Sequence, residues 1–377
     1  MSEQRPVPAC QTTDACDLNK NKVPLARIAK RDTIPVVTAW LIRAAGLLLA
    51  LLTGSLLITA LGHNPIAVYS DMINSAFGSR IGFNETVRIA VPLLGSSLAV
   101  GMAFKMRFWN IGAEGQILVG AIAATYFALF QYETLPRPVL LIAMGIAAAI
   151  AGGLWGLIPA FFRAKWGTNE TLFTLMLNYV AFGILLYVQA GPWRRSGSDF
   201  PIIAMFDASA RLPRVLGIHI GWILVLIVTV LVYLYMEHSK QGYQLSVVGE
   251  SENTARYAGM NVSRIIMRTM VISGAIAGFV GFLQVSGANN TLNETTAGGV
   301  GFTAITVAWL SQLNPLIMIL VASFIAVLER GSIRIQTTFG IPATIATVLI
   351  GMILFFMLAC EFFINYRLVF RGKGAQS

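Results

Sequence analysis

Three clusters of polar and aromatic residues interrupt a sequence that is otherwise close to hydrocarbon, and they are its candidate sites. They cover residues 108–116, 167–179 and 298–303. Polar side chains are costly to bury at membrane depth, so those found there are functional candidates. Amide, hydroxyl and carboxylate groups would hydrogen-bond a polar solute, and aromatic rings would stack on a flat ring or a sugar face. The clusters therefore indicate noncovalent binding.

The first cluster has the features of a helix start. Asn110 is a natural N-cap, and Glu114 would fall in the opening turn, where the helix dipole favours a negative charge. Transporters often bind substrate where discontinuous helices expose such ends at the bilayer centre. The alternative interpretation is a plain cap at the cytoplasmic interface.

The other two clusters offer a polar helix face and a flexible helix start. Thr174 and Asn178 are four residues apart and therefore share one face of a helix. The glycine-rich stretch 298–301 leads into an aromatic residue, although an aromatic side chain is alternatively lipid-facing or part of the core. Together the clusters supply the substrate-path candidates, which are Phe108, Asn110, Glu114, Asn169, Glu170, Thr174, Asn178, Phe302 and Thr303.

A long polar loop at 237–268 separates two apolar runs at 215–236 and 269–293. Links between packed helices usually need only about 2 to 8 residues, so this loop is longer than a connector. Ser251 and Asn253 are good N-caps and predict a short helix over 254–258. Small residues on one face of that helix, beside the large side chain of Tyr257, suit docking into a groove on another protein. A solvated amphipathic loop is the alternative.

Composition predicts an all-α, polytopic integral membrane protein. The 377 residues are 56% apolar and 12% charged, whereas ordinary soluble domains carry about 25% charged residues. A run of about 20 apolar residues spans a bilayer as a helix. We expect about ten spans, with a range of eight to ten, because 301–312 is too short to cross alone and predicts a half-helix or re-entrant segment. The spans are 36–62, 86–104, 111–131, 138–162, 170–189, 217–236, 268–288, 301–312, 315–329 and 341–364.

Small residues recur at four-residue spacing inside two of these spans. Gly145, Gly152, Gly153 and Gly156 lie in one span, and Gly274, Gly278 and Gly281 lie in another. Such faces let helix backbones approach closely in lipid. We interpret them as packing features rather than ligand contacts.

The distribution of Lys and Arg predicts that both termini are cytoplasmic. With the N-terminus inside, most of the 27 basic residues lie on the cytoplasmic side. We expect a disordered basic tail at 1–35, a transmembrane domain at 36–366 that includes the cytoplasmic loop 237–268, and a cytoplasmic tail at 367–377. Attraction to anionic membrane lipid accounts for much of the net charge of +10, without a nucleic-acid partner.

Signatures of an enzyme are missing from the sequence. There is no G-x-x-x-x-G-K-[ST] phosphate loop and no H-E-x-x-H pattern. The three histidines, His63, His219 and His238, have no carboxylate or cysteine at ligand spacing. We therefore expect no catalytic residues, metal or cofactor in this chain.

Four segments of the sequence carry a resemblance to a known family. They are GMAFKMRFWNIGAEGQILVGA, GTNETLFTLMLNYVA, ENTARYAGMNVSRIIMRTMVISGAIAGFVG and GFTAITVAWLSQLNP. Their order and spacing resemble the permease subunits of bacterial ABC importers. The most similar group is the nucleoside and simple-sugar permeases, which are related to ribose and branched-chain amino-acid permeases. The similarity covers about residues 86–366.

This resemblance implies a location in the bacterial inner membrane and a translocation path between two permease subunits, which in this group are often different chains. A separate ATPase would carry ATP and Mg, and an extracytoplasmic binding protein would deliver a nucleoside or simple sugar. The region 250–260 would be the coupling helix that docks on the ATPase. Its residues at that contact would be Glu250, Asn253, Ala255, Arg256, Tyr257, Gly259 and Met260.

Two departures from the family pattern and one alternative function remain. The stretch 250–253 is more acidic than usual, and 311–314 lacks the basic residue that often precedes Asn-Pro. The alternative is an ion- or proton-coupled secondary transporter that acts without an ATPase. Glu114 and Glu170 would then be its proton sites.

Overall fold

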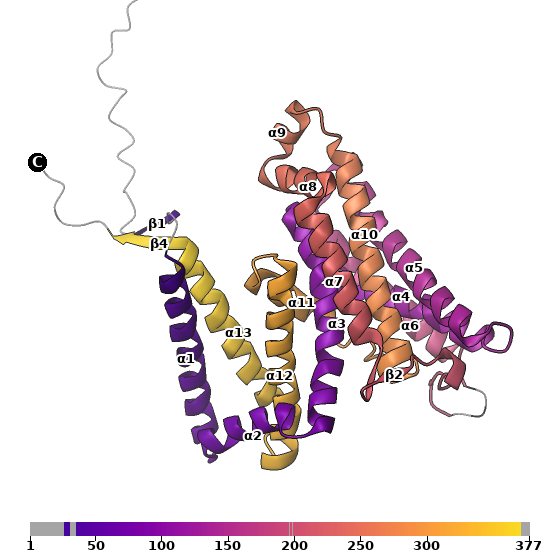
Figure 1. Cartoon of the computed structure of the whole chain (residues 1–377), viewed down its shortest axis with the longest axis horizontal. Helices are drawn as coiled ribbons and strands as arrows, with labels where there is room; N and C mark the ends of the chain where they lie inside the picture. Colours follow the sequence, from indigo (N-terminus) through magenta and orange to yellow (C-terminus); the bar gives the residue numbers. More distant parts are fainter. Residues whose placement is uncertain (1–25, 31–34, 196, 198, 371–377) are drawn as a thin grey trace, which may run out of the picture.

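The computed structural model describes residues 26–30, 35–195, 197 and 199–370, and almost all of its regular structure is helical (Figure 1). The first half contains β1 (Ala26–Lys30), α1 (Val36–Ala60), α2 (Pro65–Phe77), α3 (Arg80–Lys105), α4 (Ala113–Phe130), α5 (Arg137–Trp166) and α6 (Glu170–Ala190). The 3-10 helix η1 (Ala208–Ala210) and the strands β2 (Arg214–Val215) and β3 (Ile218–His219) follow. The second half contains α7 (Gly221–His238), α8 (Lys240–Glu250), α9 (Glu252–Tyr257), α10 (Val262–Leu283), the π-helix η2 (Gln284–Asn289), α11 (Val300–Leu310), α12 (Pro315–Phe339), α13 (Ala343–Asn365) and β4 (Tyr366–Phe370).

Nine helices in the described part of the chain are long and apolar enough to cross a membrane. The shorter α11 has 11 residues, which corresponds to about 16 Å and is half of a bilayer core of about 30 Å. The predicted all-α membrane fold is confirmed. The short segment expected at 301–312 is a helix that ends at Leu310, and Asn314 caps the helix that follows it.

The two ends of the helical bundle differ in what they carry. Figure 1 places α8, α9 and the paired strands β1 and β4 at one end, which we call the α9 end. The opposite end carries α2, and we call it the α2 end. The antiparallel pairing of β1 with β4 joins the two ends of the described chain. It was not predicted, because 26–30 falls in the expected tail; residues 1–25, 31–34 and 371–377 lie outside the described residues.

Three helices depart from the predicted spans at the α2 end, and one of them, α3, begins at Arg80 rather than at residue 86. The helix α2, capped by Asn64, was missed because its sequence PIAVYSDMINSAF is too short and polar to resemble a span. The predicted span 315–329 was too short, since α12 continues to Phe339. The charges that ended the predicted span are tolerated in the helix, and one of them, Arg334, forms an ion pair with Asp71 of α2 at 3.4 Å.

The packed centre of the protein is formed by α4, α5 and α10, whose backbones meet at glycines. A Cβ on Gly152 of α5 would collide with the carbonyl oxygen of Gly274 of α10 and would lie 2.7 Å from the Cα of Gly278. A Cβ on Gly120 of α4 would also collide with Gly278. Contacts this close leave no room for side chains, so the predicted role of these glycines in helix packing is confirmed.

Candidate functional site

The start of α4 meets the start of α11, and one carboxylate joins them. Glu114, in the first turn of α4, accepts a hydrogen bond from the backbone N–H of Gly299 at 2.7 Å and another from Gly301 at 2.7 Å. The positive ends of two helix dipoles therefore face the same negative charge. Both oxygens of Glu114 are engaged in holding α11, so in this conformation the residue orders a helix start.

The polar face of α6 is bonded to the segment that leads into α4. Asn178 accepts a hydrogen bond from Gly115 N–H at 2.9 Å and donates one to the Ile111 carbonyl at 2.9 Å. Thr174 accepts from Ile111 N–H at 3.2 Å and donates to the Glu170 carbonyl at 2.7 Å. The predicted common face of Thr174 and Asn178 is confirmed. It satisfies backbone groups that the interruption between α3 and α4 would otherwise leave unpaired.

Asn110 does not cap α4, which corrects the sequence-based expectation. The helix begins at Ala113, so Asn110 lies outside its first turn. Its amide oxygen accepts from Gly112 N–H at 3.0 Å, and its amide nitrogen donates to the Gln116 side chain at 3.3 Å. The side chain is fully buried and stabilises the turn between α3 and α4.

The aromatic candidates differ in exposure. Phe108 is 3% exposed and belongs to the core, whereas Phe302 on α11 is 43% exposed. Trp309 lies seven residues after Phe302, hence on nearly the same helix face, and stacks on Trp109 with ring centroids 5.7 Å apart. The stacking joins α11 to the segment before α4, and Trp109 was not among the predicted path residues.

Asn169 and Glu170 lie apart from the Glu114 cluster, at the first turn of α6. Asn169 caps the helix by accepting from Leu172 N–H at 3.2 Å. Glu170 forms an ion pair with Arg163 of α5 at 3.4 Å. Nine residues of helix, about 13 Å, separate Asn169 from Asn178. The structure thus brings together Asn110, Glu114, Thr174 and Asn178 beside the helix that carries Phe302 and Thr303. It leaves Asn169 and Glu170 at the α9 end.

The segment predicted as a loop at 237–268 is largely helical. It contains α8, which was not predicted, and α9, whose N-cap is Ser251 rather than Asn253. The short helix is followed by a left-handed residue, Gly259, which has a φ of +76°. Asn261 caps α10 by accepting from Arg264 N–H. Ser263 donates to the Ala164 carbonyl of α5 at 3.4 Å.

The short helix α9 presents a sharply divided surface. Ala255 is fully buried, whereas Tyr257 is 93% exposed and Glu250, Asn253, Arg256 and Gly259 are also exposed. A large aromatic side chain this exposed has no packing role within the described part of the chain. Figure 1 shows that α9 projects beyond the neighbouring helices.

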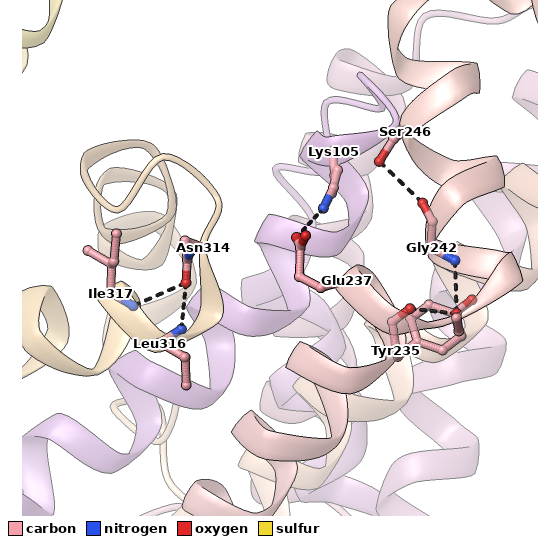
Figure 2. A network of polar contacts seen from close by, with 9 residues as sticks. Lys105, Tyr235, Glu237, Gly242, Ser246, Asn314, Leu316 and Ile317 are labelled. Atoms are coloured by element: carbon pink, nitrogen blue, oxygen red, sulfur yellow. Dashed lines mark hydrogen bonds and ion pairs between the residues drawn. The ribbon is translucent and has the colours of Figure 1, made fainter.

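Polar contacts fix the base of this projection to the bundle. Lys105, the last residue of α3, pairs with Glu237 near the end of α7 at 2.6 Å (Figure 2). Ser239 then caps α8 by accepting from Gly242 N–H at 2.9 Å. A Cβ on Gly249 of α8 would collide with the Lys105 carbonyl oxygen, so α8 lies directly on the end of α3.

The segment between α6 and α7, at the α2 end, contains one buried titratable side chain. His219 on β3 is 5% exposed, and neither ring nitrogen has a hydrogen-bond partner among the residues that the structure describes. Burial lowers the pKa of His219 to about 4, with further lowering by the charges of Arg88 and Arg214. This histidine is therefore neutral at neutral pH. Across the described ranges, no three His, Cys, Asp or Glu side chains gather as a metal site would require.

Comparison with known proteins identifies the family. Residues 83–358 match the family described as the permease component of the branched-chain amino acid transport system. This chain belongs to that family of permeases. It is 33% identical to the glucose ABC transporter permease protein TsgB13 of Haloferax volcanii, over 89% of this chain and 92% of that protein. It is 32% identical to the guanosine ABC transporter permease protein NupP of Bacillus subtilis, over 84% and 92%. It is 30% identical to the nucleoside ABC transporter permease protein NupB of Lactococcus lactis, over 84% and 90%.

Membership of the family confirms the broad interpretation of the sequence. The chain is a multi-pass membrane protein and a transport subunit rather than an enzyme. As an ABC transporter permease, it works with ATPase and substrate-binding components.

Proposed function

We propose that this permease forms half of a path for a nucleoside or simple sugar and is driven by a separate ATPase that docks on α9. The observation that carries the proposal is the exposure of Tyr257 on a short capped helix that leads directly into α10. Such a helix fits a groove on a partner. The sequence has no phosphate loop of its own, so the energy of ATP would come from that partner.

The substrate class rests on the relatives and on the chemistry of α11. Relatives over most of the chain are named for glucose, guanosine and nucleosides. The half-exposed face of α11 carries the aromatic Phe302 and the hydroxyl of Thr303, which suit stacking and hydrogen bonding to a ring. We place the path along this face. The partly buried Glu114 and the buried Thr174 and Asn178 support it from behind.

The direction of transport follows from the orientation. We place the α9 end in the cytoplasm, with both termini, and the α2 end outside, where an extracytoplasmic binding protein would deliver substrate. Closure of the ATPase pair would then move α9 and switch the path between outward and inward openings. A second, different permease chain would complete the path.

A proton-coupled carrier acting alone is the competing hypothesis. It requires a carboxylate that is free to exchange protons with the path. Glu114 accepts two backbone hydrogen bonds and Glu170 is paired with Arg163, so both candidates are occupied in this conformation. This arrangement favours structural roles for the two residues.

Uptake into proteoliposomes tests the proposal against this competitor. The permease would be reconstituted with its co-expressed ATPase, second permease and binding protein, with radiolabelled guanosine and radiolabelled glucose as probes. We expect uptake of one probe that requires ATP, is inhibited by vanadate and persists with a protonophore. Uphill uptake by this chain alone, abolished by the protonophore, would establish the carrier instead. A thermal-shift screen of the binding protein with nucleosides and sugars would define the substrate.

A further inference from the structure

One arginine at the α9 end contacts acidic residues of two different helices. Arg163 lies in the last turn of α5. Its Nε atom is 3.4 Å from Glu170 Oε2 in the first turn of α6, and its Nη2 atom is 3.5 Å from Glu252 Oε1 in the first turn of α9. A guanidinium group is a planar fork with five donors, so it can serve two carboxylates at once. Arg163 therefore joins the projecting helix α9 to the membrane helix α6.

The two acidic residues differ in what they are attached to. Glu252 is half-exposed and lies on α9 beside Asn253 of the proposed ATPase contact, and its other oxygen lies 3.7 Å from Arg256 on the same helix. Glu170 is nearly buried at the start of the membrane helix α6. Each lies at a helix N-terminus and Arg163 at a helix C-terminus, the positions that helix dipoles favour for these charges. The helix dipoles therefore favour both ion pairs of Arg163, the one with Glu170 and the one with Glu252.

On the α9 side of the Arg163 link, α9 is connected closely to two long helices, α10 and α5. Only residues 258–261 separate α9 from α10. The helix α10 in turn packs on α5 with backbone against backbone at Gly152 and Gly274. Interfaces packed this tightly do not deform gradually, so α5 and α10 are expected to shift as one unit with α9.

On the other side, α6 leads to the polar cluster in the membrane. Asn178 of α6 bonds the backbone of Ile111 and Gly115, on either side of the start of α4. The neighbouring Glu114 holds Gly299 and Gly301 at the start of α11. A displacement of α6 would therefore be passed through polar contacts to the half-helix that faces the proposed path.

We propose that Arg163 is a positioning residue that transmits movement of α9 to α6, and thereby couples ATP hydrolysis to rearrangement of α4 and α11. The inference rests on the proposed function, because it assigns a route for the coupling at the same docking surface. Without this link, α9 would still move α5 and α10, but α6 and the polar cluster would follow less closely.

The test is a double-mutant cycle on the complete transporter in proteoliposomes. Uptake of radiolabelled guanosine or glucose, whichever the unaltered complex takes up, is divided by ATP hydrolysed. We expect Arg163→Gln and Glu252→Gln each to lower this ratio about fivefold or more, while ATPase activity persists. The double variant R163Q/E252Q should be no worse than R163Q alone, because R163Q already removes the Arg163–Glu252 pair.

Conservative and control variants separate coupling from stability. Arg163→Lys keeps the positive charge but lacks the forked guanidinium group. Its ratio of uptake to ATP hydrolysis should therefore lie between those of R163Q and the unaltered protein. Arg88→Gln removes an exposed ion pair with Glu85 within α3 without involving Arg163 or α9, and the ratio should stay near the unaltered value. Glu252 is partly exposed and such pairs contribute little to stability, so E252Q remains informative even if R163Q fails to fold.

The outcomes that would overturn the inference are distinct from failure of the proposed function. An unchanged ratio of uptake to ATP hydrolysis in E252Q, in a complex that transports normally, would remove Arg163 from the coupling route. Losses in R163Q and E252Q that simply add in the double variant would also contradict it, since independent effects add. Failure of the unaltered complex to show ATP-dependent uptake would instead refute the proposed function, and the coupling role with it.

Discussion

Glu114 and Gly301 lie 187 positions apart in the sequence, yet the carboxylate of Glu114 accepts the backbone N–H of Gly301 at 2.7 Å. Gly301 is also pressed against the backbone of Glu114, since a Cβ on Gly301 would lie 2.8 Å from the Glu114 Cα. The short helix α11 is thus placed by one side chain and one close backbone approach. These contacts fix a helix that is too short to be positioned by spanning the membrane.

Replacing Glu114 with glutamine should weaken the hold on α11. Glutamine offers one acceptor oxygen, and its NH₂ group would face the second backbone donor. Because hydrogen bonds to charged groups contribute about 1.5–3 kcal/mol, we expect a lower melting temperature and uptake reduced about tenfold, with ATP dependence retained. The measurements are thermal denaturation in detergent and ATP-driven uptake. Glu133→Gln in the exposed turn after α4 is the control, and equal effects of the two variants would contradict the assigned role.

Replacing Gly301 with alanine tests the close approach independently of charge. The added methyl group would meet the Glu114 backbone, and overpacking of this kind costs about 1–3 kcal/mol. Gly183 in the middle of α6 is the matched control, because a Cβ there meets nothing within 4 Å. We expect G301A to lower the melting temperature and impair uptake, and G183A to leave both near their original values. A G301A protein as stable and active as G183A would show that the contact is not tight.

Hydropathy gave most of the helices but few of the contacts between them. The span expected at 36–62 corresponds to Val36–Ala60, and the half-helix was predicted from the shortness of 301–312. The end of α12 was missed because hydropathy treats Arg334 as exposed, whereas the structure pairs it with Asp71.

The sequence predicted which residues belong to the site, but not which groups those residues contact. Thr174 and Asn178 were assigned one face from their spacing, and the structure confirms that face. Their partners Ile111 and Gly115 were not identifiable, because they are backbone groups more than 60 positions away. For the same reason no local pattern showed that Arg163 contacts Glu252, which is 89 positions away. Long-range pairing depends on helix packing, which the sequence pattern does not specify.

The buried His219 should make stability depend on pH. Its pKa is about 4 in the folded protein and about 6.5 when unfolded, so between these values the unfolded chain binds more protons. Stability is therefore complete above about pH 6.5 and falls as the pH is lowered towards 4, by up to about 3 kcal/mol. Thermal denaturation of His219→Gln between pH 4.5 and about 7.5 should show a shallower decline than the unaltered protein. The exposed His238→Gln is the control, and parallel curves for all three proteins would contradict the assignment.

The exposed Tyr257 allows the coupling role of α9 to be tested without damage to the fold. Tyr257→Asp places a charge on the proposed docking surface, and at 93% exposure the substitution removes no internal packing. We expect the melting temperature to stay the same while uptake is lost and ATP hydrolysis is no longer linked to transport. Gly259 is less suitable, because its φ of +76° would strain any side chain placed there. Normal uptake by Y257D would argue strongly against the role of α9.

The most direct test of the central claim is a photocrosslinking measurement at position 257 in intact membranes. A photoreactive phenylalanine analogue would replace Tyr257 in the assembled transporter. A parallel Tyr257→Cys variant, with the three native cysteines replaced, would be probed with a membrane-impermeant thiol reagent. The account predicts a crosslink to the ATPase and thiol labelling only from the cytoplasmic side. Labelling of position 257 from outside the cell, with no crosslink to the ATPase, would contradict it.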